Sequence, residues 1–305
     1  MRIQEIIEYF KKRPYALRQG AGYLSKRLHC RREDIIEARN LIHNQKVVKR
    51  RLPKILIFDI ETSPMKAYVW KRWKENISLD QTISEWFMIA WSAKWLYDNN
   101  VYGDVLTPKE AILEDDSRIV KKLWELINQA DIVVAHNGNS FDIPKMNSRF
   151  IINGLPPTKP FFSVDTCRIA KKQFGFSSNK LDALAGYFGL GHKLDTTFDL
   201  WKKCMEGDET SLGYMLEYNK QDVKVLEEVY LKLLPWIKGH PNMNAFMDEP
   251  LVCTNCGSDE VELLEGQYYY TQVNKYPLLR CKHCGAIFRG RASISTETLV
   301  MNNLR

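Results

Sequence analysis

Hydrophobic residues in the middle of the chain fall into short apolar runs of the kind that form β-strands. These runs predict five strands, over residues 55–60, 87–96, 101–106, 132–135 and 161–165. A turn at residues 98–100 joins the second run to the third, which predicts an antiparallel pair. The later strands alternate with helices, so we expect parallel neighbours there. The pattern therefore predicts an α/β fold built on a mixed five-stranded sheet.

Between and after these runs, the apolar positions change to the spacing of amphipathic helices. One helix is predicted over residues 119–127 and another from Asp142 to about Asn153. From Thr166 to about Ile237 the pattern is helical throughout, and no internal repeat interrupts it. We therefore assign residues 54–240 to a single core domain.

The first 50 residues predict a separate helical module. One helical face carries four apolar residues, namely Ile3, Ile6, Ile7 and Phe10, and Pro14 ends that helix. A second helix over residues 20–28 and an Arg-rich third one from about residue 35 complete a helix-turn-helix pattern. Residues 1–50 are therefore interpreted as a nucleic-acid-binding module. A three-helix bundle that contacts the core or a partner protein is the alternative.

The net charge of +7 is unevenly distributed. Residues 1–54 carry 15 Lys and Arg against 5 Asp and Glu, which gives +10 and leaves −3 for the remainder. This asymmetry favours a polyanion bound near the N-terminus, with a solvated basic helix face as the alternative. No apolar run reaches the roughly 18 residues that span a bilayer, and the N-terminus lacks the pattern of a signal peptide. We expect no membrane partner and a cytoplasmic location, in a bacterium or a phage-infected host.

Acidic residues stand where apolar strands end. Asp59 and Glu61 are two positions apart on the first strand, so both carboxylates lie on the same face. Such a pair repels unless a cation neutralises it, and a divalent cation is suited to do so. Asp142 follows the fourth strand, and Tyr218 and Asp222 are one helical turn apart. Each residue alone is a weak signal, whereas their combination and order predict a metal site.

In this combination the chain resembles the DnaQ-like, or DEDD, exonucleases of the ribonuclease H-like superfamily. Their D-x-E motif corresponds to residues 58–62, and their H-N-x-x-F-D-like motif corresponds to residues 136–142, with one residue more than the common spacing. Their Y-x-x-x-D motif, typical of the tyrosine (DEDDy) branch, corresponds to residues 218–222. Residues 179–185 also look like the family's segment between the last two motifs. The resemblance covers residues 54–235 and is greatest to exonuclease domains related to family B DNA polymerases.

The resemblance implies a ribonuclease H-like sheet and a metal-dependent 3′–5′ exonuclease that uses two Mg²⁺ or Mn²⁺ ions. Asp59, Glu61 and Asp222 would hold one ion, and Asp59 with Asp142 would hold the second. Tyr218 would orient the attacking water, because a phenol with a pKa of about 10 is a poor general base at neutral pH.

Three further residues follow from the same motifs. Thr62, Asn137 and Phe141 would bind substrate, with Asn137 and Phe141 at the terminal nucleotide and Phe141 stacking on it. Core packing is the alternative for Asn137 and Phe141. We interpret His136 and Asp165 as structural, His136 through its hydrogen bonds.

Four of the seven cysteines form two C-x-x-C-Gly units, at residues 253–257 and 281–285. This spacing predicts one structural Zn²⁺ held by Cys253, Cys256, Cys281 and Cys284 in a zinc ribbon over residues 250–291. A redox-active dithiol is the alternative. Tyrosines and basic residues of the ribbon suit stacking on single strands, although a purely structural or protein-docking role is equally open.

The sequence therefore predicts a 3′–5′ exonuclease whose expected substrate is DNA and whose terminal modules bind nucleic acid. An RNA-directed or structure-specific nuclease is the alternative among enzymes. A non-catalytic DNA-binding regulator is the alternative outside enzymes, and the full set of acids with Tyr218 argues against it.

Overall fold

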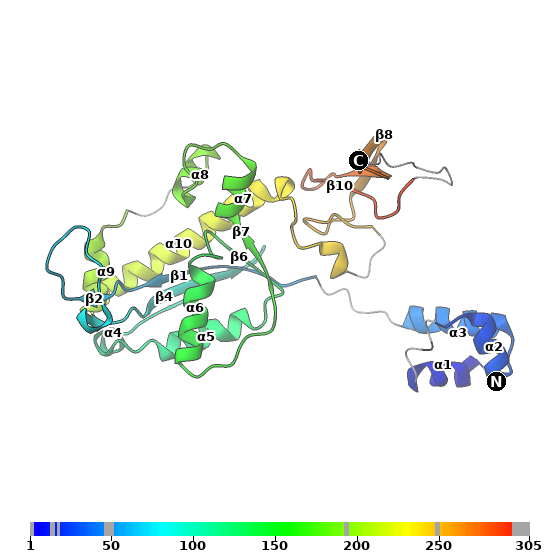
Figure 1. Cartoon of the computed structure of the whole chain (residues 1–305), viewed down its shortest axis with the longest axis horizontal. Helices are drawn as coiled ribbons and strands as arrows, with labels where there is room; N and C mark the ends of the chain where they lie inside the picture. The colour runs from blue at the N-terminus through cyan, green and yellow to red at the C-terminus, as the bar shows by residue number, and fades with distance from the viewer. Residues whose placement is uncertain are drawn as a thin grey trace. The chain divides into compact units, whose positions relative to one another are not determined.

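The computed structural model of the chain describes residues 3–12, 16, 19–45, 52–191, 195–247 and 251–294. The chain divides into two compact units, Met1–Arg51 and Leu52–Arg305 (Figure 1). The carboxyl-terminal unit includes both the core and the cysteine-rich segment. Pro14, predicted to end the first helix, lies outside the described residues.

The described residues of the N-terminal unit include three α-helices, α1 (Ile3–Lys12), α2 (Ala21–Leu28) and α3 (Arg32–Gln45), which confirms the three predicted helices. Its core is formed by seven buried residues, namely Ile6, Ile7, Phe10, Ala16, Leu24, Ile35 and Ala38. His29 follows α2 with a left-handed φ of 51° and turns the chain toward α3. The use of these helices as a helix-turn-helix stays a prediction.

The larger unit is built on a five-stranded sheet with the order β5-β4-β1-β6-β7. Its strands are β1 (Ile55–Thr62), β4 (Met88–Trp95), β5 (Val101–Val105), β6 (Ile132–Ala135) and β7 (Phe162–Asp165). β4 is antiparallel to both β1 and β5, whereas β6 is parallel to both β1 and β7. The predicted mixed sheet is confirmed.

In the described part of the larger unit, seven α-helices accompany the sheet: α4 (Pro108–Leu113), α5 (Ser117–Ile127), α6 (Asp142–Ile152), α7 (Thr166–Gln173), α8 (Leu181–Tyr187), α9 (Phe198–Met205) and α10 (Glu209–Leu233). The expectation of continuous helix from Thr166 to Ile237 was wrong for three of the described segments. α7 is followed by non-helical residues 174–180, α8 by non-helical residues that include 195–197, and α9 by non-helical residues 206–208. The first of these segments lines the site described below, where extended backbone exposes polar groups that a helix would bond internally.

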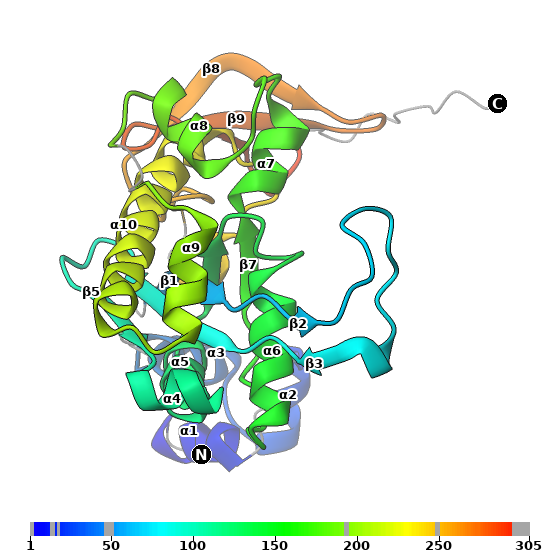
Figure 2. The ribbon, with the colours of Figure 1, turned by 90° about the vertical axis from the view of Figure 1, so that its left-hand side faces the viewer.

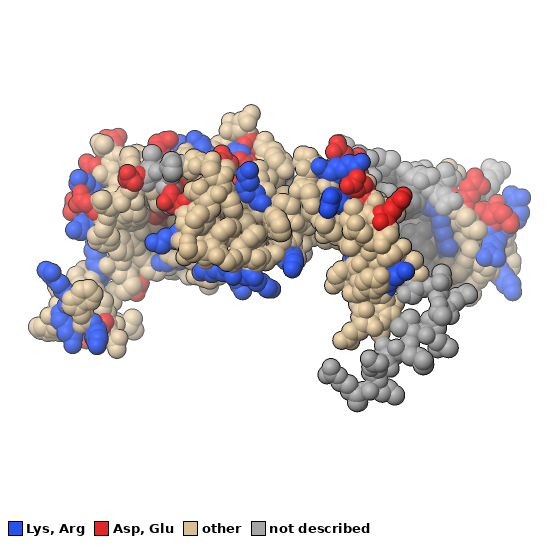
Figure 3. All heavy atoms as spheres, turned by 90° about the horizontal axis from the view of Figure 1, so that it is seen from above, with Lys and Arg blue, Asp and Glu red and all other residues tan. Residues whose placement is uncertain are grey.

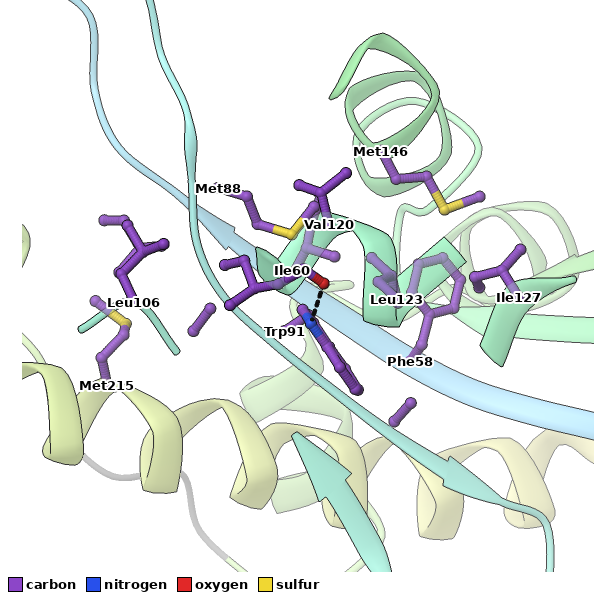
Figure 4. Packing of buried hydrophobic residues seen from close by; sticks show 14 of the residues in the cluster. Phe58, Ile60, Met88, Trp91, Leu106, Val120, Leu123, Ile127, Met146 and Met215 are labelled. Carbon is purple, nitrogen blue, oxygen red and sulfur yellow. Dashed lines mark hydrogen bonds between the residues drawn. The ribbon is translucent and has the colours of Figure 1, made fainter. Parts of the chain in front are cut away.

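Buried side chains cover both faces of β1. Leu56, Phe58 and Ile60 pack into one cluster with residues of α5 and α6 (Figure 4), and Trp91 donates its indole N–H to the carbonyl of Ile119 at 2.8 Å. Ile55 and Ile57 point to the opposite face, into a second cluster with residues of α8 and α10. Since side chains alternate along a strand, Asp59 and Glu61 continue this second face toward the end of β1.

One segment between β1 and β4 has no counterpart in the predicted strands. It contains β2 (Lys66–Ala67), the short 3₁₀ helix η2 (Leu79–Gln81) and β3 (Thr82–Ser84). β2 and β3 pair in antiparallel fashion and form a separate two-stranded sheet. We refer to residues 66–84 as the β2–β3 hairpin.

After α10 the chain passes through two 3₁₀ helices, η3 (Leu234–Trp236) and η4 (Met243–Ala245), to a second sheet. This sheet has the order β10-β9-β8, with β8 (Val261–Tyr270), β9 (Lys275–Cys281) and β10 (Ile287–Arg289) all antiparallel. Asn255 donates its side-chain N–H to the carbonyls of Leu234 and Ile237 at 2.8 and 3.2 Å, which fixes this part to the end of α10. Among the described helices, none combines the length and apolar character needed to cross a bilayer.

Candidate functional site

Three carboxylates converge at the end of β1. Asp59 and Glu61 come from β1, and Asp222 comes from the middle of α10, which packs against the same strand. One carboxylate oxygen from each residue lies within 4.8 Å of the others. β6 pairs with β1 only as far as Ile57, so the sheet opens beside Asp59 and leaves space for a ligand. Three all-oxygen ligands so close together form a donor set that suits Mg²⁺ or Mn²⁺.

Asp142 joins this group through the backbone of β1. It is the first residue of α6, its side chain is buried, and its Oδ1 accepts a hydrogen bond from the backbone N–H of Ile60 at 3.2 Å. Ile60 lies between Asp59 and Glu61, so the fourth predicted acid lies beside the other three. Burial raises the pKa of Asp142 to about 7. A cation bound beside Asp142 would favour its ionised form.

Asn219 is a residue of this site that the sequence analysis missed. It is fully buried on α10 and donates its side-chain N–H to Oδ2 of Asp59 at 2.6 Å. The hydrogen bond fixes the orientation of one carboxylate oxygen of Asp59. A signal was present, because Asn219 lies within the Y-x-x-x-D motif, three residues before Asp222 and thus on nearly the same helical face.

Tyr218 lies one turn before Asp222 on α10 and is 7% exposed. Its ring packs edge to face against Trp201 of α9, with ring centroids 6.4 Å apart. The contact holds the phenol in place at the edge of the carboxylate group.

The four acids and Tyr218 open into one cavity of about 640 Å³. Its further lining includes Asn137 and Phe141, as the sequence predicts, but not Thr62. The side chain of Phe141 is 38% exposed and so is available to a ligand. The substrate role of Thr62, Asn137 and Phe141 stays a prediction, with the position of the last two residues favourable to it.

Two cations of the cavity were not foreseen. Lys171 of α7 and Lys180, just before α8, line it together with polar residues of the connecting segment, namely Ser177, Ser178, Asn179 and Asp182. Both lysines are exposed. Their ammonium groups add positive charge to the lining of the cavity that holds the carboxylates, and positive charge of this kind attracts an anionic phosphate backbone.

His136 and Asp165 organise the wall of the cavity. His136 donates from Nε2 to the carbonyl of Asn179 at 2.9 Å, and its Nδ1 lies 2.9 Å from Oγ1 of Thr166. Asp165 accepts hydrogen bonds from the backbone N–H groups of Asn137 at 3.0 Å and Asn139 at 3.2 Å. These contacts agree with the structural interpretation of both residues.

The turn between β6 and α6 has room for glycine alone at position 138. A Cβ atom on Gly138 would lie 2.4 Å from the Cβ of Ala135. The close approach lets the chain reverse tightly, so that Asn137 and Phe141 face the cavity while Asp142 begins α6.

Part of the core is similar to a known protein family. Residues 95–234 match a family described as the RNase_H superfamily. The mixed five-stranded sheet of the core is consistent with an RNase H-like fold. The matched range includes Asp142, Tyr218 and Asp222, whereas Asp59 and Glu61 precede it and join the site through β1.

Among proteins with curated functions, none matches this sequence. One similar solved structure is the family B DNA polymerase from the hyperthermophilic archaeon Pyrobaculum calidifontis, with 18% sequence identity and a TM-score of 0.46. The match covers 60% of this chain and 25% of the polymerase chain. The chain therefore matches only about a quarter of the length of that protein.

An RNase H-like fold together with a carboxylate cluster supports a metal-dependent nuclease. The superfamily and the acidic cluster together also imply a nucleic-acid substrate.

A second metal-ligand cluster lies in the part of the chain that follows the RNase H-like domain. Its four members are Cys253, Cys256, Cys281 and Cys284, whose sulfur atoms all lie within 4.8 Å of one another. The Sγ–Sγ distances are 3.7 Å for Cys253–Cys284 and 3.6 Å for Cys256–Cys281. A tetrahedral Zn²⁺ with Zn–S bonds of about 2.3 Å places its sulfurs about 3.8 Å apart, whereas a disulfide needs about 2.05 Å. The cluster fits zinc and not a disulfide.

Both cysteine units use the same backbone turn. Gly257 and Gly285, each directly after the second cysteine of its pair, have φ values of 79° and 85°. This left-handed conformation favours glycine. Backbone N–H groups point at sulfur in both units, from Asn255 to Cys253 at 3.4 Å and from Cys284 to Cys281 at 3.5 Å.

Proposed function

We propose that this protein is a metal-dependent 3′–5′ exonuclease of the DEDDy type that hydrolyses phosphodiester bonds of DNA. The proposal is supported above all by the convergence of Asp59, Glu61 and Asp222 within 4.8 Å, beside Asp142 and Tyr218. Asp59, Glu61 and Asp222 would hold one Mg²⁺ or Mn²⁺ ion, and Asp59 with Asp142 would hold a second. Such ions supply Lewis-acid stabilisation of the phosphate and lower the pKa of the attacking water.

Side chains of the protein orient the metal ligand and the attacking water and bind the substrate. Asn219 holds Asp59 in position for cation binding. Tyr218 orients the attacking water by its hydroxyl, and Lys171 and Lys180 bind phosphate groups along the cavity wall. Phe141 stacks on the terminal base, and Asn137 contacts the same nucleotide.

The terminal modules would recruit the substrate. The N-terminal helices carry the excess of positive charge found in residues 1–54, and the cysteine module, as a zinc ribbon, exposes Tyr269 and Tyr270 at 48% and 67%. Both features suit nucleic-acid binding. The division into modules at residues 1–50, 54–240 and 250–291 is part of this proposal.

The test is a cleavage ladder. Single- and double-stranded DNA and RNA, each labelled at the 5′ end, are incubated with the full chain with and without Mg²⁺. We expect Mg²⁺-dependent ladders that shorten one nucleotide at a time from the 3′ end of DNA. RNA ladders alone would instead support the RNA-directed alternative, and internal cuts a structure-specific nuclease.

A double variant tests whether the cleavage activity depends on the carboxylates of β1. Asp59→Ala with Glu61→Ala should abolish the ladder, whereas Glu125→Ala, at an exposed position on α5, should leave it unchanged. An undiminished ladder from the double variant would remove the assignment. DNA binding without any Mg²⁺-dependent cleavage would favour the non-catalytic regulator.

A further inference from the structure

The β2–β3 hairpin exposes aromatic side chains to an unusual degree. Trp70 is 94% exposed, Trp73 is 83% exposed, and Tyr68 is 73% exposed. Tryptophan is largely buried in most folded proteins, and neighbouring exposed aromatics commonly mark a binding surface. Figures 1 and 2 show the segment between β2 and β3 as a loop that extends away from the packed elements of the domain.

The tip of the hairpin has a defined backbone conformation. The carboxylate of Glu75 accepts hydrogen bonds from the backbone N–H groups of Trp70 at 3.0 Å and Lys71 at 2.8 Å. Gln81 donates its side-chain N–H to the carbonyl of Tyr68 at 3.2 Å and to Glu75 at 3.3 Å. These bonds close the turn from within, so the tryptophan rings are presented outward by a formed loop.

The base of the hairpin is fixed to the domain. Lys66 forms an ion pair of 2.7 Å with Glu114, at the end of α4, and Ser84 donates its hydroxyl to the same carboxylate at 3.2 Å. Both strands of the hairpin are therefore attached to the end of α4.

The charge of the tip is complementary to nucleic acid. Residues 68–74 contain Lys71, Arg72 and Lys74 and no acidic residue. The nearest acid, Glu75, uses its carboxylate for the backbone N–H groups described above. In Figure 3 the hairpin forms the lobe at the lower left, on which Lys and Arg predominate among the charged residues. Alternating tryptophans and cations of this kind match a single strand, whose bases stack on rings and whose phosphates need positive charge.

A row of side chains connects the hairpin to the cavity. Trp86 follows β3 by two residues, and the ammonium group of Lys145 lies 3.7 Å from the centre of its ring. The same ammonium group lies 5.3 Å from the ring centre of Phe141, which lines the cavity. Aromatic and cationic groups therefore continue from the active-site cavity toward the attachment of the hairpin.

We propose that the tip of the β2–β3 hairpin is a second binding site for the substrate strand. Trp70 and Trp73 stack on unpaired bases upstream of the 3′ end in the cavity, while Lys71, Arg72 and Lys74 contact the intervening phosphates. The inference rests on the proposed function, since it extends the path of the strand that the cavity cleaves. The ligand class is single-stranded nucleic acid, whose exposed bases allow stacking.

The test measures oligonucleotide affinity and phosphodiester hydrolysis separately. Affinity for a 5′-labelled single-stranded oligo(dT) is measured by fluorescence anisotropy in buffer without Mg²⁺ or Mn²⁺, where no cleavage occurs. Hydrolysis of the p-nitrophenyl ester of thymidine 5′-monophosphate is measured separately with Mg²⁺, because this small substrate reaches only the cavity. The variants are Trp70→Ala/Trp73→Ala, the ring-preserving Trp70→Phe/Trp73→Phe, and the control Leu79→Ala/Ile83→Ala, two exposed apolar residues of the same hairpin.

We expect the Trp70→Ala/Trp73→Ala variant to bind the oligonucleotide at least about tenfold more weakly than wild type, since each stacked base contributes a substantial part of the affinity. The phenylalanine variant and the control should bind nearly as wild type, and ester hydrolysis should be unchanged in all three. Affinity of the alanine variant within about twofold of wild type, or an equal loss in the control, would overturn the proposal. If wild type fails to hydrolyse the ester, the proposed function is wrong. The comparison of oligonucleotide affinities would still show whether the hairpin binds single-stranded nucleic acid.

Discussion

The side-chain amide of Asn219 donates a hydrogen bond of 2.6 Å to Oδ2 of Asp59. The two residues are 160 positions apart in sequence, and the bond joins α10 to β1 at the centre of the carboxylate group. Replacing a group that orients a metal ligand commonly lowers metal affinity or activity. The bond therefore gives a direct way to test whether Asp59 acts as a ligand.

Asn219→Ala removes the donor and with it one constraint on the orientation of the Asp59 carboxylate. We expect kcat/KM for DNA cleavage to fall by about 10- to 100-fold and the Mg²⁺ concentration at half-maximal activity to rise. Asn219→Asp is the companion variant, since it keeps the shape but adds a negative charge that also disturbs Asp59. An unchanged Mg²⁺ requirement in both folded variants would show that Asn219 has only a packing role.

Asp142→Asn separates the charge of Asp142 from its structural hydrogen bond. The amide oxygen still accepts the N–H of Ile60, so the fold should persist and the free energy of unfolding should change little. Activity should be lost, because a neutral amide is a poor ligand for a second divalent cation. The measurements are urea denaturation and the cleavage ladder, and an active Asp142→Asn enzyme would exclude a role in metal binding.

The ion pair between Glu110 and Arg118 predicts a pH dependence of stability away from the site. Hydrogen bonds of 2.7 and 2.8 Å join the two side chains, and the bond to Arg118 lowers the pKa of Glu110 from 4.5 to about 2. A carboxylate with a lowered pKa stabilises the folded state above its unfolded pKa, and this contribution is lost as the pH falls from about 4.5 toward 2.

Glu110→Gln should therefore lower the free energy of unfolding by about 1 kcal/mol at pH 7. The difference from wild type should shrink at pH 3 and disappear near pH 2, as urea denaturation at each pH would show. Glu125→Gln, exposed on α5, is the matched control and should have no effect at any of these values. A deficit for Glu110→Gln that stays constant down to pH 2 would contradict the role of its charge.

The cysteine module predicts one zinc ion per chain. Metal analysis of the purified protein should give equimolar zinc, and Cys253→Ser with Cys281→Ser should lose it. Since small modules of this kind depend on their metal for folding, chelation should unfold β8, β9 and β10. Asn255 contacts the end of α10 and not the five-stranded sheet. The secondary structure of that sheet should therefore remain after chelation. A metal-free protein with four titratable thiols and an ordered module would instead favour the dithiol.

Local patterns were enough to predict much of the fold and its acidic residues. The apolar run at the start of β1 made a buried strand clear, and its two-residue period placed Asp59 and Glu61 on one face. The one-turn spacing of Tyr218 and Asp222 likewise followed from helical geometry. The two C-x-x-C-Gly units marked four cysteines that the structure brings together.

Features that depend on tertiary packing were not predictable in this way. Nothing near Asn219 in sequence shows that Asp59 is its partner, because the contact arises only when α10 packs on β1. Lys180 lines the cavity at the end of the non-helical segment after α7, where the helical pattern was misleading, whereas Lys171 lines it from α7 itself. The β2–β3 hairpin was missed because its exposed aromatic residues follow neither the strand nor the helix period.

The central claim, that Asp59, Glu61 and Asp222 form a divalent-cation site, can be tested directly by diffraction. Crystals of the full chain soaked in Mn²⁺ would be measured at the manganese absorption edge. The account predicts an anomalous peak within coordination distance of all three carboxylates and a second peak between Asp59 and Asp142. A saturating soak that leaves no manganese bound to Asp59 would contradict it.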